Sequence, residues 1–165
     1  MSEVIFETSQ RLGDCLLKQG ATVTVAESCT GGALASAMTD VAGSSKWFRV
    51  GFITYANRYK KQLLSVPDSI LRRDGAVSEA VVREMAIGAA RIAEADYAIA
   101  ISGIAGPGGG TTDKPVGTVW FAWFAGGLVG AQRLQFDGDR RAVRSQAVAF
   151  SLQQLLHLAT ESNTV

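Results

Sequence analysis

The sequence predicts an α/β fold, a three-layer α/β/α sandwich around a mixed, mostly parallel sheet. Three observations lead to this prediction. Stretches with helical apolar spacing alternate with short β-branched or apolar stretches along most of the chain. The stretch YAIAI at Tyr97–Ile101 is apolar throughout, as expected for a central strand that is covered on both faces. Near the end of the chain, Gly126-Gly127 joins two apolar stretches, which indicates an antiparallel hairpin.

The first part of the chain predicts two strands, each followed by a helix. The stretch TVTVA is rich in β-branched residues, which favour strands, and Gly20 just before it is a typical helix stop. The expected elements are a helix at Val4–Gln19, a strand at Thr22–Ala26, a helix at Ala33–Thr39, a loop at 42–45, a strand at Val50–Tyr55 and a helix at Asn57–Leu64. A further short element is expected to start at Pro67-Asp68.

The second part predicts one long helix, the central strand, the hairpin and a last helix. Ser78 is a favourable N-cap, with Glu79 in the first turn of a helix that is expected to reach about Ala95. The remaining expected elements are the strand Tyr97–Ile101, an irregular glycine-rich stretch at 102–115, the hairpin strands Gly117–Ala125 and Leu128–Phe136, and a helix from its cap Asp139 to about Thr160.

Length and composition indicate one domain that spans residues 1–165. The chain of 165 residues is 47% hydrophobic with a mean hydropathy of +0.15, which is ample for a buried core. The 16 Lys and Arg residues and the 15 Asp and Glu residues are spread along the chain and give a net charge of +1. A protein that binds nucleic acid by neutralising phosphates normally carries a stronger basic stripe, so nucleic acid is not expected as a partner.

Cysteine and histidine usage predicts neither a disulfide framework nor a metal site. The chain has two cysteines, Cys15 and Cys29, and one histidine, His157. The N-terminal stretch MSEVIFETSQ lacks the basic and apolar regions of a signal peptide, and no apolar stretch is long enough to span a membrane. These features favour a reduced, cytoplasmic protein without a membrane partner.

Three junctions between strands and helices are candidates for a site, because open α/β sheets bind ligands at the carboxyl ends of their strands. The first, Ser28–Gly32, places Ser28 on a strand-to-helix turn with two glycines. Such a turn can hold a hydroxyl over backbone N–H groups that stabilise an oxyanion, although the G-x-S-x-G and G-x-x-x-x-G-K-[ST] patterns are missing. The alternative is that Ser28 or Thr30 only caps the next helix.

A serine nucleophile needs a base, and the usual histidine is missing from these junctions. His157 lies among leucines in the last expected helix, where it serves as surface or core filler, and the same absence makes Cys29 a buried thiol rather than a nucleophile. Lys60 or Lys61, of which only one can face the site, can replace histidine if burial or a neighbouring cation keeps the amine neutral. Tyr55, at the end of the second strand, can relay or orient a proton. The alternative is that both lysines are solvated helix residues.

Two further groups of residues suit a negatively charged ligand. The stretch Gly103–Gly110 offers many N–H groups and few side chains, so it can cradle a phosphate or a carboxamide, or it can be a flexible loop. Arg140 and Arg144 lie four residues apart at a helix start, where they can clamp a phosphate or form a solvated charged face. The residues alone predict a polar, glycine-lined site and leave the reaction open.

The same junctions resemble a known family. The stretch AESCTGG at 26–32 resembles the signature of the CinA C-terminal domain family. Further matches are GFITY at 51–55 with Asn57 and Lys60, GAVS at 75–78, SGIAGP at 102–107 with Gly109 and Gly110, KPVGTV at 114–119 and GDR at 138–140. These matches cover nearly the whole chain in order, so the chain is identified as a member of this family. Larger members carry an additional N-terminal domain that is not expected here.

The stand-alone members of this family are nicotinamide-nucleotide amidases. The resemblance therefore implies an enzyme that converts nicotinamide mononucleotide to nicotinate mononucleotide and ammonia in pyridine nucleotide salvage, with no metal or organic cofactor. It implies that Ser28 is the nucleophile, Lys60 its general base and Tyr55 a supporting residue, and that Arg140 or Arg144 holds the phosphate. The other residues expected to bind substrate are Thr30, Gly31, Gly32, Ser102, Gly103, Ile104, Ala105 and Gly106. Backbone N–H groups of Gly31, Gly32 or the stretch 103–106 are expected to stabilise the oxyanion.

Two other functions stay open at the level of sequence. A non-catalytic, nucleotide-binding accessory module associated with competence would use the same fold and pocket, and the intact set of Ser28, Tyr55 and Lys60 argues against it. An amidase for another small amide is the third possibility. A homo-oligomer is expected, and the apolar hairpin GTVWFAWFAGG can form its interface or belong to the core.

Overall fold

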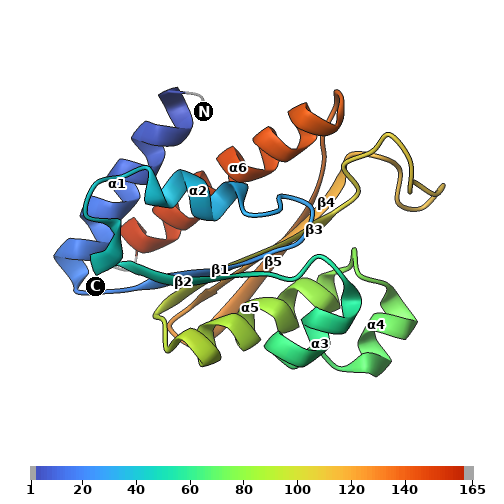
Figure 1. Cartoon of the computed structure of the whole chain (residues 1–165), viewed down its shortest axis with the longest axis horizontal. Helices are drawn as coiled ribbons and strands as arrows, with labels where there is room; N and C mark the ends of the chain where they lie inside the picture. Colours follow the sequence, from blue (N-terminus) through green and yellow to red (C-terminus); the bar gives the residue numbers. More distant parts are fainter. Residues whose placement is uncertain (1–2, 162–165) are drawn as a thin grey trace.

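The computed structural model describes residues 3–161 of the chain and contains one five-stranded sheet (Figure 1). The strands are β1 (Val23–Glu27), β2 (Phe48–Ile53), β3 (Tyr97–Gly103), β4 (Thr118–Ala125) and β5 (Leu128–Gln135), in the spatial order β2-β1-β3-β4-β5. Strand β1 runs parallel to both of its neighbours, whereas β4 runs antiparallel to β3 and β5. The predicted α/β class with a mixed sheet is confirmed, and its parallel pairs lie in the half that carries the junctions after β1, β2 and β3.

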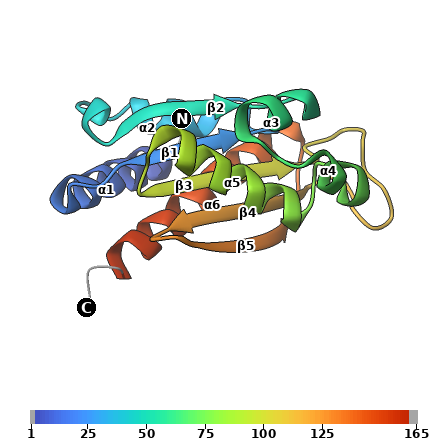
Figure 2. The ribbon, with the colours of Figure 1, turned by 90° about the horizontal axis from the view of Figure 1, so that it is seen from below.

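Helices cover both faces of the sheet and complete the three layers (Figures 1 and 2). One face carries α1 (Glu3–Gln19), α2 (Ala33–Thr39) and α6 (Arg140–Glu161), and the other carries α5 (Glu79–Ala93) with the shorter α3 (Asn57–Leu64) and α4 (Asp68–Asp74). A short 3₁₀ turn at Ser44–Lys46 precedes β2. Each face has its own apolar core, so the central strand β3 is buried on both sides as its sequence predicts.

The element boundaries fall within two residues of those expected, and the largest correction concerns the second strand. It spans Phe48–Ile53 rather than Val50–Tyr55. The N–H of Thr54 makes the last contact with β1, at the carbonyl oxygen of Glu27 (2.8 Å), and the carbonyl groups of Thr54 and Tyr55 turn toward Lys60. The helix after Ser78 ends at Ala93 rather than at about Ala95. The correction at β2 matters for function, because it places Tyr55 in a loop at the edge of the sheet.

The local signals for turns and caps are confirmed. Gly126 and Gly127 both have positive φ angles, +56° and +84°, and they join β4 to β5 in a two-residue hairpin of the kind that glycine pairs favour. Ser78 Oγ accepts a hydrogen bond from the N–H of Val81 (3.4 Å) at the start of α5. Asp139 Oδ1 accepts one from the N–H of Ala142 (2.8 Å) at the start of α6. Within the described residues, no helix combines the length and apolarity that a membrane crossing needs.

Candidate active site

Ser28 lies in the turn that follows β1. Its N–H donates to the carbonyl oxygen of Ile101 in β3 (3.0 Å), which fixes the backbone of the turn to the sheet. Its side chain is buried, and the hydroxyl oxygen lies 3.1 Å from Nζ of Lys60 in α3. Because β1 and β2 are parallel neighbours, the residues that follow them meet at one edge of the sheet.

Glu27 holds this turn in place, although the sequence analysis did not single it out. Its carboxylate is completely buried and accepts hydrogen bonds from three N–H groups at the start of α2, those of Gly32 (3.0 Å), Leu34 (3.1 Å) and Ala35 (2.8 Å). The residue at the N-cap position is Gly32, so the alternative in which Ser28 or Thr30 caps this helix is wrong. The signal for Glu27 is its negative charge before a helix start, where the helix dipole favours a carboxylate.

Lys60 is completely buried beside Ser28. Its Nζ lies within hydrogen-bond distance of the carbonyl oxygens of Thr54 (2.6 Å) and Tyr55 (3.3 Å) as well as of Ser28 Oγ. Burial lowers the pKa of Lys60 from 10.5 to about 8, with a smaller opposing effect from Cys29. In its neutral form this amine can donate to the two carbonyls and accept the hydroxyl proton of Ser28 through its lone pair. The geometry therefore suits a serine with a lysine as its base.

A cavity of about 210 Å³ borders Ser28 and Lys60. Its other lining residues come from the three junctions, the connection before α5 and the start of α6: they are Cys29, Tyr55, Ala76, Val77, Ser102, Gly103, Ala105 and Arg140. The fold thus gathers segments that lie far apart in the sequence around one small space. Such a space suits a ligand group the size of a carboxamide on a ring, rather than a polymer.

The two candidate arginines occupy different places. Arg140 lines the cavity, where it donates to the carbonyl oxygen of Gly106 (2.8 Å) and to the hydroxyl of Tyr55 (3.0 Å). Arg144 does not line it; its Nη2 donates to the carbonyl oxygen of Thr30 (2.9 Å) from a separate cavity of about 250 Å³ between α2 and α6. Arg140 is therefore placed to contact a ligand in front of Ser28, whereas Arg144 holds the turn that follows Ser28 through the Thr30 carbonyl.

Tyr55 is exposed at the mouth of the cavity, with 61% of its surface accessible. Its carbonyl oxygen contacts Lys60, and its hydroxyl accepts the hydrogen bond from Arg140. The hydroxyl of Tyr55 thus faces Arg140, whereas its contact with Lys60 comes from its backbone carbonyl.

The remaining predicted residues frame the cavity or contribute backbone to it. Ser102 is buried and faces the cavity with Gly103 and Ala105. The residues that do not line it are Thr30, Gly31, Gly32, Ile104, Gly106 and Arg144. The N–H of Gly31 donates to Ser28 O (3.1 Å), that of Gly32 to Glu27, and that of Ile104 to Thr118 O (2.8 Å). These N–H groups are already engaged and are not free to stabilise an oxyanion.

Cys29 also lines the cavity, but its environment is unfavourable for a thiolate. Burial raises the pKa of Cys29 from 9.0 to about 11. His157 lies on the exposed side of α6 beside Glu161 and does not line the cavity. Within residues 3–161, no group of three or more His, Cys, Asp or Glu side chains is placed to hold a metal ion.

Comparison with known proteins identifies the family. The model of the CinA C-terminal domain matches residues 6–159. The chain belongs to this family. The prediction of the family from the sequence is therefore confirmed, and the match includes every element that contributes to the cavity in front of Ser28.

Relatives of known name point to one enzyme class. Nicotinamide-nucleotide amidohydrolase PncC from Escherichia coli K12 is 55% identical over 152 residues, which cover 92% of each chain. The protein of the same name from Pseudomonas putida is 52% identical, over 92% of this chain and 94% of its own. A CinA superfamily protein from Klebsiella pneumoniae has the same fold, with a TM-score of 0.92 and 42% identity, over 95% of this chain and 98% of that one. The prediction that this member of the CinA C-terminal domain family is an enzyme, a hydrolase, is confirmed.

Proposed function

We propose that this protein hydrolyses the carboxamide of nicotinamide mononucleotide to give nicotinate mononucleotide and ammonia, by a Ser28–Lys60 mechanism. The observation that carries the proposal is the 3.1 Å approach of Lys60 Nζ to Ser28 Oγ beside a cavity that Arg140 also lines. The names of the relatives supply the substrate class. The reaction would belong to pyridine nucleotide salvage.

In the first half of the proposed reaction, Ser28 Oγ attacks the carboxamide carbon while neutral Lys60 accepts its proton. The oxyanion then needs N–H donors, and those of Gly31 and Gly32 are engaged. Ala105 lines the cavity, and its N–H has no backbone acceptor among the described residues, so we assign the oxyanion contact to this part of the loop. Lys60 returns the proton to the leaving nitrogen as the C–N bond breaks, and ammonia departs.

The second half of the reaction releases the acid. The first half leaves the acyl group on Ser28 as an ester, and neutral Lys60 can now accept a proton from water as that water attacks the ester carbon. The C–O bond to Ser28 breaks, and Lys60 returns the proton to Oγ. The sum is one amide and one water converted to one acid and one ammonia, without a cofactor.

Arg140 is the proposed phosphate ligand, and Arg144 is not. A guanidinium at the start of α6 combines its own charge with the positive end of the helix dipole. On binding, the phosphate would replace the weaker neutral acceptors that Arg140 now contacts, Gly106 O and the hydroxyl of Tyr55. Arg144 instead keeps the Thr30 carbonyl in place.

The decisive experiment measures ammonia release from nicotinamide mononucleotide by wild type, Ser28→Ala and Lys60→Ala, with a chelator present. We expect turnover by wild type that survives chelation and falls at least about a thousand-fold in both variants. A folded wild type without turnover would contradict the proposal. Retained binding of the nucleotide in that case would favour the accessory module instead.

A second experiment tests the choice between the arginines. Wild type is expected to prefer the mononucleotide to the riboside, and Arg140→Ala to lose most of that preference. Arg144→Ala is the matched control: it should lower turnover on both substrates alike and keep the preference. Equal rates on the riboside and the mononucleotide in wild type would remove the phosphate contact from the proposal.

A cytoplasmic location and a homo-oligomer are also part of the proposal. Two unpaired thiols, Cys15 and Cys29, support a reducing compartment. Exposed apolar side chains on β2 and α3, those of Ile53, Tyr59 and Leu63, support an interface there. The apolar side chains of β4 belong largely to the core instead. Light scattering coupled to size-exclusion chromatography measures the oligomeric state.

A further inference from the structure

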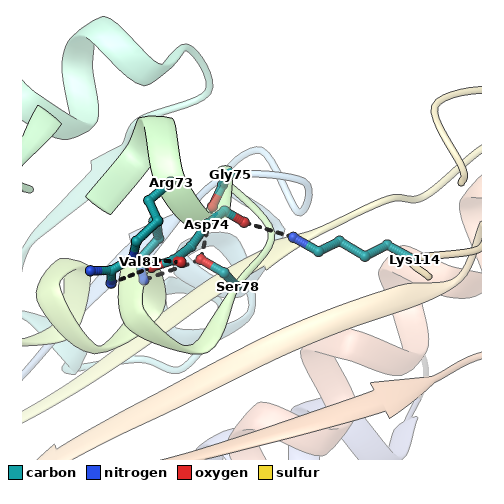
Figure 3. Close-up of polar contacts among 6 residues, drawn as sticks. All are labelled: Arg73, Asp74, Gly75, Ser78, Val81 and Lys114. Atoms are coloured by element: carbon teal, nitrogen blue, oxygen red, sulfur yellow. Dashed lines mark hydrogen bonds and ion pairs between the residues drawn. The ribbon is translucent and has the colours of Figure 1, made fainter. Parts of the chain in front are cut away.

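Two motifs that mark the family, GAVS at 75–78 and KPVGTV at 114–119, have no part in the chemistry proposed above. The structure brings them together (Figure 3). The Lys114 ammonium donates a hydrogen bond of 2.7 Å to the carbonyl oxygen of Asp74, and it lies beside Gly75. The contact spans 40 positions in sequence and joins the α4–α5 connection to the glycine-rich loop that follows β3.

The α4–α5 connection forms one wall of the catalytic cavity. Ala76 and Val77 are half-buried and line that cavity. The turn that presents them begins at Gly75, whose φ of +76° suits glycine, and Ser78 Oγ donates to the carbonyl oxygen of Gly75 (2.8 Å). The two carbonyls at the start of the turn, those of Asp74 and Gly75, are thus each held by one side chain. Among the described residues, Lys114 is the one of these two partners that comes from outside the segment.

The loop that carries Lys114 is itself well anchored. The N–H of Lys114 donates to Thr111 Oγ1 (3.1 Å), and the carbonyl oxygen of Lys114 accepts from the N–H of Thr111 (2.9 Å), so the two residues close a tight turn. Further along, the N–H of Gly117 donates to the carbonyl oxygen of Ile104 (2.7 Å), next to Gly103 in the cavity lining. Lys114 therefore connects two parts of the cavity lining, the Ala76–Val77 segment and the chain that follows β3 at Gly103.

We propose that Lys114 is a positioning residue that holds the Ala76–Val77 wall against the ring of the substrate. The inference rests on the proposed function, because it takes the ring of an aromatic carboxamide as the group that contacts this wall. Both side chains are apolar, which suits the face of a flat ring. Release of the clamp would loosen the wall without moving Ser28 relative to Lys60, whose contacts involve neither segment. Substrate binding should weaken more than the chemical step.

Arg73 provides a matched control, because it also contacts Asp74, at its side chain rather than at its carbonyl. Its Nε and Nη2 bind the Asp74 carboxylate at 2.9 and 2.7 Å, as Figure 3 shows. The Arg73 side chain is 70% exposed, and within residues 3–161 its polar contacts are with Asp74 in the same helix, α4, rather than with the loop. Arg73→Ala thus removes a contact to Asp74 and leaves the Lys114 clamp intact.

Amide hydrogen exchange of the ligand-free protein tests the clamp independently of catalysis. The amide of Gly75 donates to the carbonyl oxygen of Leu71 (3.1 Å) and shares its peptide unit with the Asp74 carbonyl that Lys114 holds. In Lys114→Met, this amide is expected to exchange at least about tenfold faster than in wild type. Lys114→Arg, which keeps a donor of similar reach, should restore slow exchange, and Arg73→Ala should match wild type. Unchanged exchange in Lys114→Met would overturn the clamp.

Steady-state kinetics on nicotinamide mononucleotide test the consequence. Lys114→Met is expected to raise KM about five- to tenfold and to leave kcat within about twofold, with recovery in Lys114→Arg. Faster exchange with an unchanged KM would overturn the role of the wall. A fall in kcat together with a rise in KM, both in proportion to a lower melting temperature, would overturn it as well. If wild type releases no ammonia, the proposed function fails, and the exchange result alone decides the clamp.

Discussion

The two faces of helix α3 give neighbouring lysines different chemistry. On the inward face, Lys60 is completely buried, and its Nζ meets two carbonyl oxygens and the Ser28 hydroxyl. On the outward face, 43% of the Lys61 side chain is exposed, and its Nζ pairs with Asp68 Oδ1 at 2.6 Å. The residue type and the helix are the same, so the difference comes from the surroundings of each amine.

The surroundings of each lysine change its pKa by stabilising or destabilising the charged ammonium form. Burial disfavours the ammonium of Lys60, and none of its contacts in the described chain is a carboxylate, so its pKa falls to about 8. Lys61 meets a carboxylate in solvent, and its hydrogen bond lowers the pKa of Asp68 instead. The comparison teaches that burial next to neutral acceptors, rather than the residue type, lowers the pKa of a lysine amine.

The largest expected effect comes from removing each amine in turn. Lys60→Met is expected to lower the rate of ammonia release about a thousand-fold, because Ser28 loses its base, whereas Lys61→Met should stay within about twofold of wild type. Circular dichroism checks that both variants are folded. A comparable loss in Lys61→Met would end the distinction between the two faces.

The pH dependence of turnover sharpens the comparison. In the proposed mechanism Lys60 acts as a base in its neutral form, so kcat is expected to rise about tenfold per pH unit below its pKa of about 8 and to level off above it. A pH–rate profile of wild type and of Lys61→Met, from pH 5.5 to 9.5 in buffers of constant ionic strength, should give the same curve for both. A rate that is already constant from pH 6 would contradict a lysine base.

The lowered pKa of Lys60 should also make the stability of the fold depend on pH. Between pH 8 and 10.5 the unfolded chain keeps the Lys60 proton while the folded chain has lost it, so the free energy of unfolding rises with pH in this window. The expected rise is about 3 kcal/mol, measured by urea denaturation. Cys29, with its pKa raised to about 11, acts in the opposite direction above pH 9. The difference between wild type and Lys60→Met isolates the lysine, and equal slopes would refute the assignment.

The smallest effect is expected on the outward face. Asp68→Asn removes the partner of Lys61 and should shift the melting temperature at pH 7 by less than about 3 °C, with kcat unchanged. The pKa of Asp68 is lowered, so its contribution is present above the ordinary value of 3.8 and is lost as the pH falls through the lowered one. Thermal scans at pH 7 and pH 3 measure it. A large shift at pH 7 would mean that the pair is part of the core of the fold.

Local sequence chemistry predicted much of the fold because it acts over a few residues. The glycine pair at 126–127, the caps Ser78 and Asp139 and the apolar run at 97–101 each depend on neighbours in sequence, and each is where it was expected. The resemblance to the family also named Ser28 and Lys60, which the structure places 3.1 Å apart. The residues alone left Lys60 and Lys61 as alternatives, because the rotation of α3 about its axis depends on packing.

The sequence by itself determined the α/β class, the edge of the sheet at which the strands end and the site loops begin, and the residue types available there. The tertiary structure decided which of them meet: Glu27 rather than Ser28 caps α2, Arg140 rather than Arg144 lines the cavity, and Lys114 reaches Asp74. These contacts join segments whose separation in sequence carries no periodic signal. Their energy depends on burial and on distances of a few ångströms between side chains, which only the packed chain defines.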